Sequence, residues 1–329
     1  MFKSNRRASA ALLVLAAVAM APTGCAKKEE VKPTGPKVYR VAFASFGPDS
    51  AADNAIQGYL DGLKSEGIVE GRNLEVIKKH AAGDIATLPT MMQSLDGEGL
   101  DLIVPMTTPG VAAAASKLKQ TPAVFVYTYD PLAAGAGKSL TDHLPNMTGV
   151  ASFPSMKDTV RVIRELVPGL KTLGTIYNAS EANSVRAVKE VRAELDAAGI
   201  KLEAVTVATT ADTTMATQAI LERKVDAIWI TGDNTLLQGI EGVLGPAGRA
   251  KIPVVMNDPE YVDRGAVAAV GIGWPASGLA AGKMAARVLR GESPAGIPIE
   301  NIANARVVLN KKQAAKIGLA IPASLKGTE

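Results

Sequence analysis

The sequence predicts an α/β protein of two lobes, each with a parallel sheet covered by helices. Short apolar runs alternate with amphipathic stretches along the chain, which indicates strands alternating with helices. This alternation restarts near residue 151, and it favours parallel strands joined by crossover helices. About 300 residues remain once an N-terminal leader is set aside, which is more than one core usually organises.

The N-terminus has the features of an export signal. Basic residues precede an apolar run over residues 10–21, which is too short to span a bilayer permanently. We therefore expect residues 1–24 to be a lipoprotein signal peptide. Small residues lead into Cys25, the pattern at which bacterial lipoproteins are cleaved and acylated. Cys25 is the single cysteine and has no disulfide partner, so lipidation is favoured over an ordinary signal with an incidental cysteine.

The residues after the leader are expected to form a flexible tether over 25–37, because they are polar or helix-breaking. The formal charge of the whole chain is +4, and three of its positive charges lie in the leader with no acidic residue beside them. The mature chain is thus close to neutral, and nothing in its charge points to nucleic acid. No later apolar run is long enough to cross a membrane.

The elements follow in order along each half. In the first half we expect strands at 38–46, 73–79, 102–105, 123–127 and 148–152, with helices at 51–66, 88–95 and 111–118. In the second half we expect strands at 172–177, 201–207, 227–230, 254–256 and 266–272, with helices at 160–166, 182–198, 215–223 and 236–247.

The last segments are expected to cross between the lobes. A helix at 276–289 has no strand partner nearby in the second half, so we assign it to the first lobe, whereas a strand at 306–309 and a helix at 311–317 complete the second. The expected lobes are therefore residues 38–150 with 274–302, and residues 151–273 with 303–329. Several crossings of this kind would form a multi-strand hinge.

Polar side chains follow the predicted strands, at the edge where open parallel sheets bind ligands. Thr107 and Thr108 precede a proline at a helix start, and they could hold a carboxylate or simply cap the helix. Asn183 and Ser184 could offer further donors from the second lobe, or again form a cap.

Two acidic residues are candidates for binding an ammonium group. Asp233 stands at a predicted helix start, where a carboxylate remains ionised, although a helix cap is an equal alternative. Asp258 is a weaker candidate, because the proline beside it also fits a simple turn.

Aromatic residues end several strands and could enclose an apolar or planar ligand, although core packing is the alternative for each one. They are Phe46, Tyr127, Tyr129 and Trp274.

Catalytic and cofactor motifs are not found. The chain has two histidines, no cysteine after residue 25, no metal-ligand spacing and no phosphate or dinucleotide loop. We therefore expect no catalytic residue, no metal and no cofactor.

Several stretches together resemble a known family, the type I periplasmic solute-binding proteins of ABC importers, in the branch that binds tryptophan and other amino acids. The specific stretches are residues 177–184 and 233–235, and weaker ones are 58–63, 104–109, 130–131, 148–150, 225–227 and 282–285. The similarity runs from about residue 39 to 321. The first loop departs from the branch, because Phe46-Gly47-Pro48-Asp49 stands where an acidic-histidine-proline loop is common.

The resemblance implies two Rossmann-like lobes, three crossover segments and a ligand enclosed when the lobes close. It implies a pocket that includes Thr108, Asn183, Ser184, Asp233, Asn234 and Asp258. Asp130, in the matching stretch 130–131, is a further candidate for ligand binding. It also implies a partner permease with a separate ATPase, and a chain that acts as a monomer. The expected ligand is a small molecule, an amino acid or a similar small organic acid. The protein would be anchored by lipid and face the periplasm or the cell exterior.

Two other functions remain open at this point. A sensory lipoprotein would present the same fold but hand its ligand to a receptor. A secreted α/β enzyme would need a nucleophile beside a base, and the sequence singles out no such pair.

Overall fold

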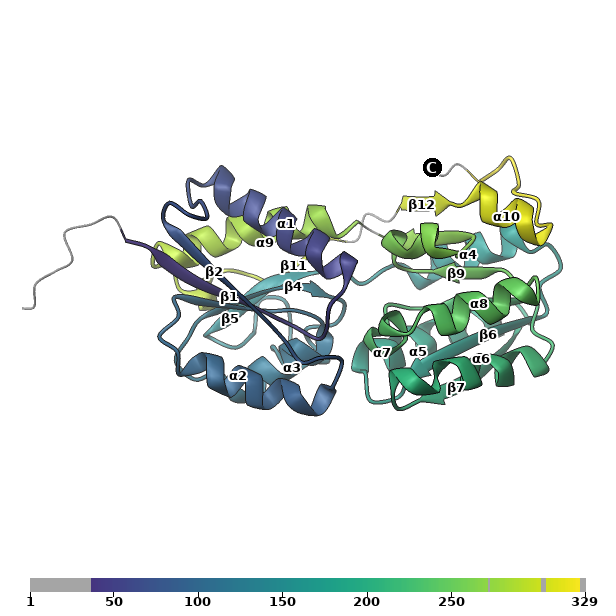
Figure 1. Cartoon of the computed structure of the whole chain (residues 1–329), viewed down its shortest axis with the longest axis horizontal. Helices are drawn as coiled ribbons and strands as arrows, with labels where there is room; N and C mark the ends of the chain where they lie inside the picture. The colour runs from purple at the N-terminus through teal and green to yellow at the C-terminus, as the bar shows by residue number, and fades with distance from the viewer. Residues whose placement is uncertain (1–36, 272, 303–305, 326–329) are drawn as a thin grey trace, which may run out of the picture. The chain divides into compact units, whose positions relative to one another are not determined.

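The computed structural model describes residues 37–271, 273–302 and 306–325, so the expected signal peptide, Cys25 and nearly all of the tether lie outside it. Its elements form the predicted two-lobe α/β fold, with one six-stranded sheet in each lobe (Figure 1). None of the helices in these ranges is long and apolar enough to cross a membrane.

The first sheet has the strand order β11-β5-β4-β3-β1-β2, and its strand pairs are parallel. Its strands are β1 (Tyr39–Ser45), β2 (Leu74–His80), β3 (Leu102–Pro105), β4 (Ala123–Thr128), β5 (Met147–Ala151) and β11 (Glu300–Asn301). Its helices are α1 (Ser50–Ser65), α2 (Leu88–Asp96), α3 (Thr108–Lys117) and α9 (Trp274–Leu289), with short 3-10 turns η1 (Ile85–Thr87) and η4 (Pro294–Gly296). β3 and β4 are buried at every position, as apolar runs covered on both faces should be.

The second sheet has the order β12-β10-β9-β8-β6-β7. Its strands are β6 (Thr172–Asn178), β7 (Lys201–Val207), β8 (Ala227–Ile230), β9 (Val254–Met256), β10 (Ala268–Gly271) and β12 (Arg306–Leu309). The helical segments are α4 (Met156–Leu166), α5 (Ala182–Ala197), η2 (Thr210–Asp212), α6 (Thr213–Glu222), α7 (Asn234–Gln238), α8 (Glu241–Arg249), η3 (Pro259–Arg264) and α10 (Lys311–Ile317). β12 runs antiparallel to β10, so this sheet is parallel except at one edge.

The structure differs from the predicted elements in where two of the helical segments begin and end. The single helix expected at 236–247 is two helices, α7 and α8, separated near Gly239. Gly239 is the C-cap of α7, and a Cβ there would lie 2.7 Å from Cγ2 of Thr210, so this position has no room for a side chain. α4 begins four residues earlier than expected, because Ser155 caps it by accepting a hydrogen bond from the N–H of Asp158.

The chain passes three times between the two sheets. It leaves the first sheet after β5, returns after β10 through α9, and leaves again between β11 and β12. α9 lies against α1 in the first lobe, as Figure 1 shows. The first residue of α9, Trp274, therefore follows directly from the second sheet and stands where the two lobes meet.

Glycines make the close packing of α1 on α9 possible. A Cβ added to Gly58 or Gly62 would lie 2.3–2.4 Å from a backbone oxygen of α9. A Cβ on Gly278 or Gly282 would meet a backbone oxygen of α1 at 2.3 or 2.1 Å. Because backbone meets backbone here, a side chain on either helix would force the pair apart.

We predict that Gly282→Ala destabilises the protein despite alanine's higher helix propensity. The propensity gain is about 1 kcal/mol, whereas overpacking costs about 1–3 kcal/mol, so a net loss and a lower Tm are expected. The matched control is Gly296→Ala, whose Cβ would enter open space. Thermal unfolding of both variants checks this, and an unchanged Tm for Gly282→Ala would contradict it.

Candidate functional site

A cavity lies between the lobes, at the ends of strands from both sheets. It is lined by Thr107, Thr108, Tyr127 and Tyr129 of the first lobe, by Asn183, Gly232, Asn234, Leu237 and Asp258 of the second, and by Trp274 at the crossover. A second cavity adjoins it and shares Thr107, Tyr127 and Asn234; its other lining residues are Ser45, Phe46, Gly47, Asp49, Ala52 and Gln238. Each has a volume of about 10 Å³, room for roughly one water molecule. The lobes are therefore closed on each other, and a solute can enter only if they separate.

Two asparagines of the second lobe present oxygen atoms at this cavity. The Nδ2 group of Asn183 donates to the carbonyl of Gly232 at 2.8 Å, and its buried Oδ1 has no partner among the described residues. The Nδ2 group of Asn234 donates to Glu181 at 2.6 Å. Because a carbonyl and a carboxylate only accept, both amide orientations are fixed by their partners. Each asparagine thus offers its oxygen, an acceptor, to whatever fills the cavity.

Asp258 adds a third acceptor to the same wall. It is 1% exposed; its Oδ1 accepts a hydrogen bond from the indole Nε1 of Trp274 at 3.3 Å, and its Oδ2 has no partner in the described chain. Burial, followed by the charges of Glu260 and Asp49, raises the pKa of Asp258 to about 8. A buried carboxylate oxygen without a partner is costly unless a cation or donor reaches it.

The opposite wall, in the first lobe, offers donors. The hydroxyl oxygen of Thr107 accepts from the N–H of Gly110 at 3.3 Å, which caps α3, and that of Thr108 accepts from the N–H of Asp130 at 3.2 Å. The hydroxyl hydrogens remain to be donated. The N-terminus of α3 also favours negative charge at this place.

Aromatic rings close the cavity between these walls. The rings of Tyr129 and Trp274 are stacked with centroids 5.5 Å apart, and Tyr127 meets Trp274 edge-on at 4.5 Å. Phe153, in the first crossover, packs edge-on against Tyr129 at 6.0 Å. These rings form an apolar surface beside the acceptors and donors.

Two residues of the cavity wall are held in a strained backbone conformation. Thr107 has φ 70° and Tyr127 has φ 57°. Such conformations cost on the order of 1–3 kcal/mol for a non-glycine residue and are concentrated at functional sites. Here they aim one donor and one ring into the cleft.

The structure brings together most of the residues named from the sequence, but it leaves Asp130, Ser184 and Asp233 outside the lining of both cavities. Ser184 donates its hydroxyl to Asp233 at 2.7 Å, and Asp130 pairs with Arg186 across the lobes at 3.1 Å. Phe46 lines only the adjoining cavity. Cys25 lies outside the described residues.

Asp233 caps α7, which was the alternative to the ammonium-binding role considered for it. Its Oδ1 accepts from the N–H of Leu236 and caps α7, and its Oδ2 accepts from the N–H of Asn178 at 2.6 Å and from Ser184. Burial, then the charge of Glu181, raises its pKa. Both oxygens are occupied inside the second lobe, as the helix-cap alternative predicts, whereas Oδ2 of Asp258 has no partner among the described residues.

The sequence alone did not indicate a role for Glu181 at this site. This residue is fully buried, and its two oxygens accept from the backbone N–H and side-chain groups of Asn234 and Thr235 at 2.6–2.9 Å. From sequence, Glu181 resembled an ordinary acidic residue before a helix. Only the approach of a loop some fifty positions away reveals that it orients Asn234.

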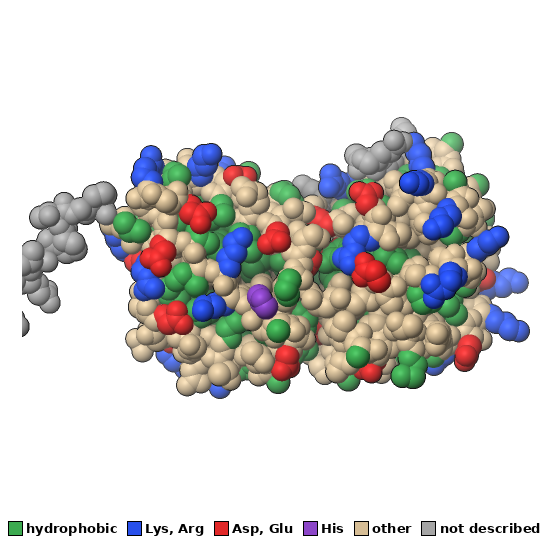
Figure 2. Space-filling view, in the orientation of Figure 1, with side chains coloured by type: hydrophobic (Ala, Val, Ile, Leu, Met, Phe, Trp, Pro, Cys, Tyr) green, Lys and Arg blue, Asp and Glu red, His purple; other side chains and the backbone are tan. Residues whose placement is uncertain are grey.

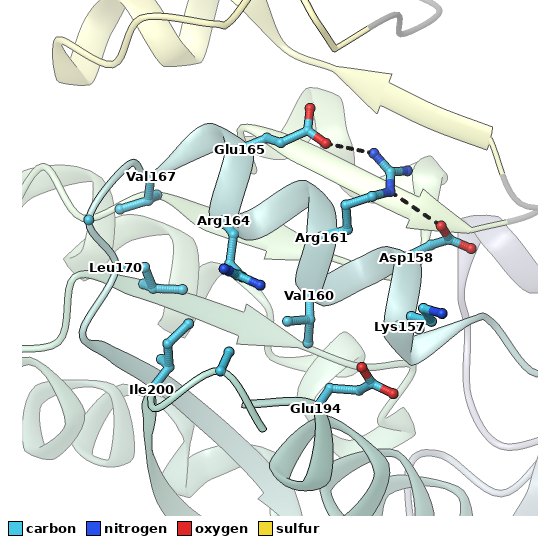
Figure 3. A pocket seen from close by; sticks show the side chains of 12 residues that line it. Lys157, Asp158, Val160, Arg161, Arg164, Glu165, Val167, Leu170, Glu194 and Ile200 are labelled. Carbon is cyan, nitrogen blue, oxygen red and sulfur yellow. Dashed lines mark hydrogen bonds and ion pairs between the residues drawn. The ribbon is translucent and has the colours of Figure 1, made fainter. Parts of the chain in front are cut away.

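A larger hollow lies on the outside of the second lobe, between α4 and α5 (Figure 3). Its volume is about 630 Å³, and it is open to solvent. Arg161 in its rim pairs with Glu165 at 2.9 Å and with Asp158 at 3.4 Å, both exposed contacts of little energetic weight. None of the unpartnered buried atoms found in the described residues belongs to it. The interlobe cavity, by contrast, is lined by two residues with such atoms, Asn183 and Asp258.

Other kinds of site find no support in the described ranges. No group of three or more potential metal-ligating side chains occurs there. Basic and acidic side chains are both present on each lobe of the face seen in Figure 2, as a nearly neutral chain predicts.

Comparison with known proteins identifies the class of protein that carries such a cleft. Residues 40–328 match the family of ABC transporter substrate binding proteins, and the chain belongs to this family. A tyrosine-binding protein of Clostridioides difficile (strain R20291) is 26% identical over 318 residues, which cover 94% of this chain and 92% of that protein. These relatives are binding proteins rather than enzymes.

Two solved structures extend the comparison. An ABC domain from Streptococcus pneumonia in complex with L-Trp is 31% identical, has a TM-score of 0.83, and is matched over 88% of this chain and 97% of its own. The ligand-free, open structure of CD0873, a substrate binding protein with adhesive properties from Clostridium difficile, is 25% identical with a TM-score of 0.66, over 88% of this chain and 100% of that one.

The raised pKa of Asp258 predicts how its replacement changes stability with pH. Between the unfolded pKa near 4 and the folded value of about 8, the folded wild type holds a proton that the unfolded chain releases, so rising pH destabilises it. The amide that replaces the carboxyl in Asp258→Asn does not titrate. The stability of this variant relative to wild type should therefore grow by about 1.4 kcal/mol per pH unit across this window.

Urea unfolding at pH 5, 6, 7 and 8 measures this difference. Asp263→Asn, an exposed carboxylate on the same 3-10 turn, is the control and should parallel the wild type. Parallel pH profiles for Asp258→Asn and wild type would show that Asp258 is already ionised in the folded protein.

Proposed function

We propose that this protein captures a zwitterionic amino acid in the interlobe cavity and delivers it to an ABC permease. The observation that carries the proposal is the opposed polarity of the two walls. The second lobe offers three acceptors, from Asn183, Asn234 and Asp258, and the first lobe offers the hydroxyl hydrogens of Thr107 and Thr108. An ammonium group fits the first set and a carboxylate the second.

The charges of the lining narrow the ligand class. The lining residues of the two cavities include two carboxylates, Asp258 and Asp49, and no lysine or arginine. A solute with a net negative charge and no ammonium group would meet the charge of Asp49 and find no cation to pair with, which is unfavourable. This favours a zwitterion over a simple organic acid and disfavours dicarboxylic amino acids.

The rings of Tyr127, Tyr129 and Trp274 favour an aromatic or apolar side chain on that amino acid. The relatives point the same way, because one is a tyrosine-binding protein and another was solved with L-Trp. Aromatic L-amino acids are therefore the first ligands to test.

Export and anchoring complete the proposed role. Signal cleavage and acylation at Cys25 would tether the folded body to a membrane, with the permease and its ATPase as partners. The body would act as a monomer outside the cytoplasm. Transfer of the solute to a signalling receptor is the alternative that uses the same cavity, and growth on the ligand as sole nitrogen source separates import from sensing.

A thermal-shift screen tests the ligand class. The body starting at Lys37 contains both six-stranded sheets, and at one hundred times Kd a ligand should stabilise it by about 2.7 kcal/mol, a shift of several degrees. We expect this shift with an aromatic L-amino acid. The corresponding α-hydroxy acid and the amino acid amide should give little or none, because each leaves one wall unpaired.

The same screen on two variants assigns the ammonium site. Asp258→Asn should weaken amino-acid binding by roughly 30-fold or more, the usual effect of removing one partner of a buried charge pair. Asp263→Asn should bind like wild type. Equal shifts for the amino acid and its α-hydroxy analogue in the wild type would refute ammonium recognition.

A separate variant tests the anchor. Cys25→Ser in the full chain should move the protein from the membrane fraction to the soluble fraction after export, because a single acylation site supplies the proposed attachment. Mass spectrometry of the wild-type N-terminal peptide should show an acylated Cys25. Retention of the serine variant in the membrane fraction would mean that something other than acylation of Cys25 holds it there.

A further inference from the structure

Asp49 occupies the loop in which the sequence departs from its family, and it is fixed firmly to the first lobe. The residue precedes α1 and caps it, because its Oδ1 accepts from the N–H of Ala51 at 3.0 Å. Its carbonyl accepts from the N–H of Asp53 at 3.0 Å. Its carboxylate therefore keeps its place when the lobes move.

This carboxylate receives two phenols, one from each lobe. The hydroxyl of Tyr127, which belongs to β4 in the first lobe, donates to Oδ2, and the hydroxyl of Tyr261, on η3 of the second lobe, donates to Oδ1. Burial, and then the charge of Asp49, raise the pKa of both tyrosines, so both remain donors. Hydrogen bonds from such donors to a carboxylate are among the stronger ones in proteins.

The hydrogen bond from Tyr261 to Asp49 joins the two lobes, as does the buried bond from the indole of Trp274 to Asp258. Beside the bond to Asp49, Nε2 of Gln238 donates to the carbonyl of Pro48 at 3.0 Å, an exposed contact. The ion pair of Arg186 with Asp130 also crosses, but its guanidinium is 45% exposed, which limits its strength. Tyr261 is 1% exposed.

The contact is linked to the ligand cavity through Tyr127. This ring lines both interlobe cavities and meets Trp274, whose indole bonds Asp258. Asp49 thus holds the ring wall in place whether or not Tyr261 is bound. Because Tyr127 and Asp49 belong to the same lobe, separation of the lobes would break the bond to Tyr261 and leave the bond to Tyr127.

We infer that Asp49 is the positioning residue for closure: it stays bound to Tyr127 and receives Tyr261 when the lobes close, so it sets how long a solute stays enclosed. This inference rests on the proposed capture function for its kinetic consequence. We call the hydrogen bond between Tyr261 and Asp49 the latch. It acts on the closed state and makes no contact that distinguishes one amino acid from another.

The first experiment measures solute kinetics in Tyr261→Phe by stopped-flow fluorescence, with the amino acid found in the thermal-shift screen. The dissociation rate should rise about tenfold or more, as loss of one hydrogen bond to a charged group predicts, and the association rate should change little. The ranking of ligands should stay the same. Tyr177→Phe, which removes a phenol from β6 of the same lobe, is the matched control and should behave as wild type.

The pairing with Asp49 is tested by repeating Tyr261→Phe in an Asp49→Ser background. Serine still caps α1 but is too short to reach both phenols. The effect of Tyr261→Phe should then fall to about twofold or less. An undiminished effect in this background would overturn the role of Asp49.

A second measurement needs no solute and so separates this inference from the proposed function. The body from Lys37 has no cysteine, and the exposed positions Asn54→Cys on α1 and Glu222→Cys on α6 accept a dye pair for energy transfer between the lobes. Ligand-free Tyr261→Phe should show lower transfer than wild type and Tyr177→Phe the same. Unchanged transfer together with an unchanged dissociation rate would overturn the latch, whereas a failed ligand screen alone would overturn only the proposed ligand.

Discussion

A buried carboxylate oxygen without a partner in the described chain is the constraint on which the site depends. Asp258 is nearly inaccessible to solvent, and only one of its oxygens is satisfied there, by the indole of Trp274. Burial makes its charged form unfavourable, and the neighbouring charge of Glu260 adds to this. The folded protein thus keeps an unfavourable group at the cavity wall, and the ammonium group of the proposed ligand would relieve it.

The scaffold places that group opposite its complement. Parallel sheets direct the carboxyl ends of their strands to one edge, and here the edges of two sheets meet, so that Thr107 and Thr108 face Asn183, Asn234 and Asp258. Residues behind the wall fix the polarity. Glu181 turns the amide of Asn234, the carbonyl of Gly232 turns that of Asn183, and backbone N–H groups occupy the threonine oxygens. In the proposed site, these supporting groups would therefore decide which polar groups of a solute each wall accepts.

Residues at and near the crossover segments connect the cavity wall of one lobe to the other lobe. α9 is held on α1 by backbone contacts that glycines permit, yet its first residue reaches the acceptor wall of the second lobe. Asp49 and Tyr127 belong to the first lobe, whereas Tyr261 belongs to the second. A small rotation about the crossovers would exchange these contacts for water, and a solute bridging the two walls would favour the closed arrangement.

The order of strands and helices, the two-lobe α/β class and most of the lining residues followed from the sequence alone, because apolar periodicity and strand-end position are local properties. For that reason the sequence could predict that Thr107, Asn183 and Asp258 line the interlobe cavity. It could not predict the hydrogen bonds that each of these side chains makes there. Asp233 and Asp258 both follow a predicted strand. Both carboxylate oxygens of Asp233 accept hydrogen bonds, whereas only one oxygen of Asp258 has a partner among the described residues. Glu181 and Tyr261 gained their roles in the same way. Tertiary structure decided these roles, because the hydrogen-bond partners of a buried polar group are set by whichever segments the fold brings beside it.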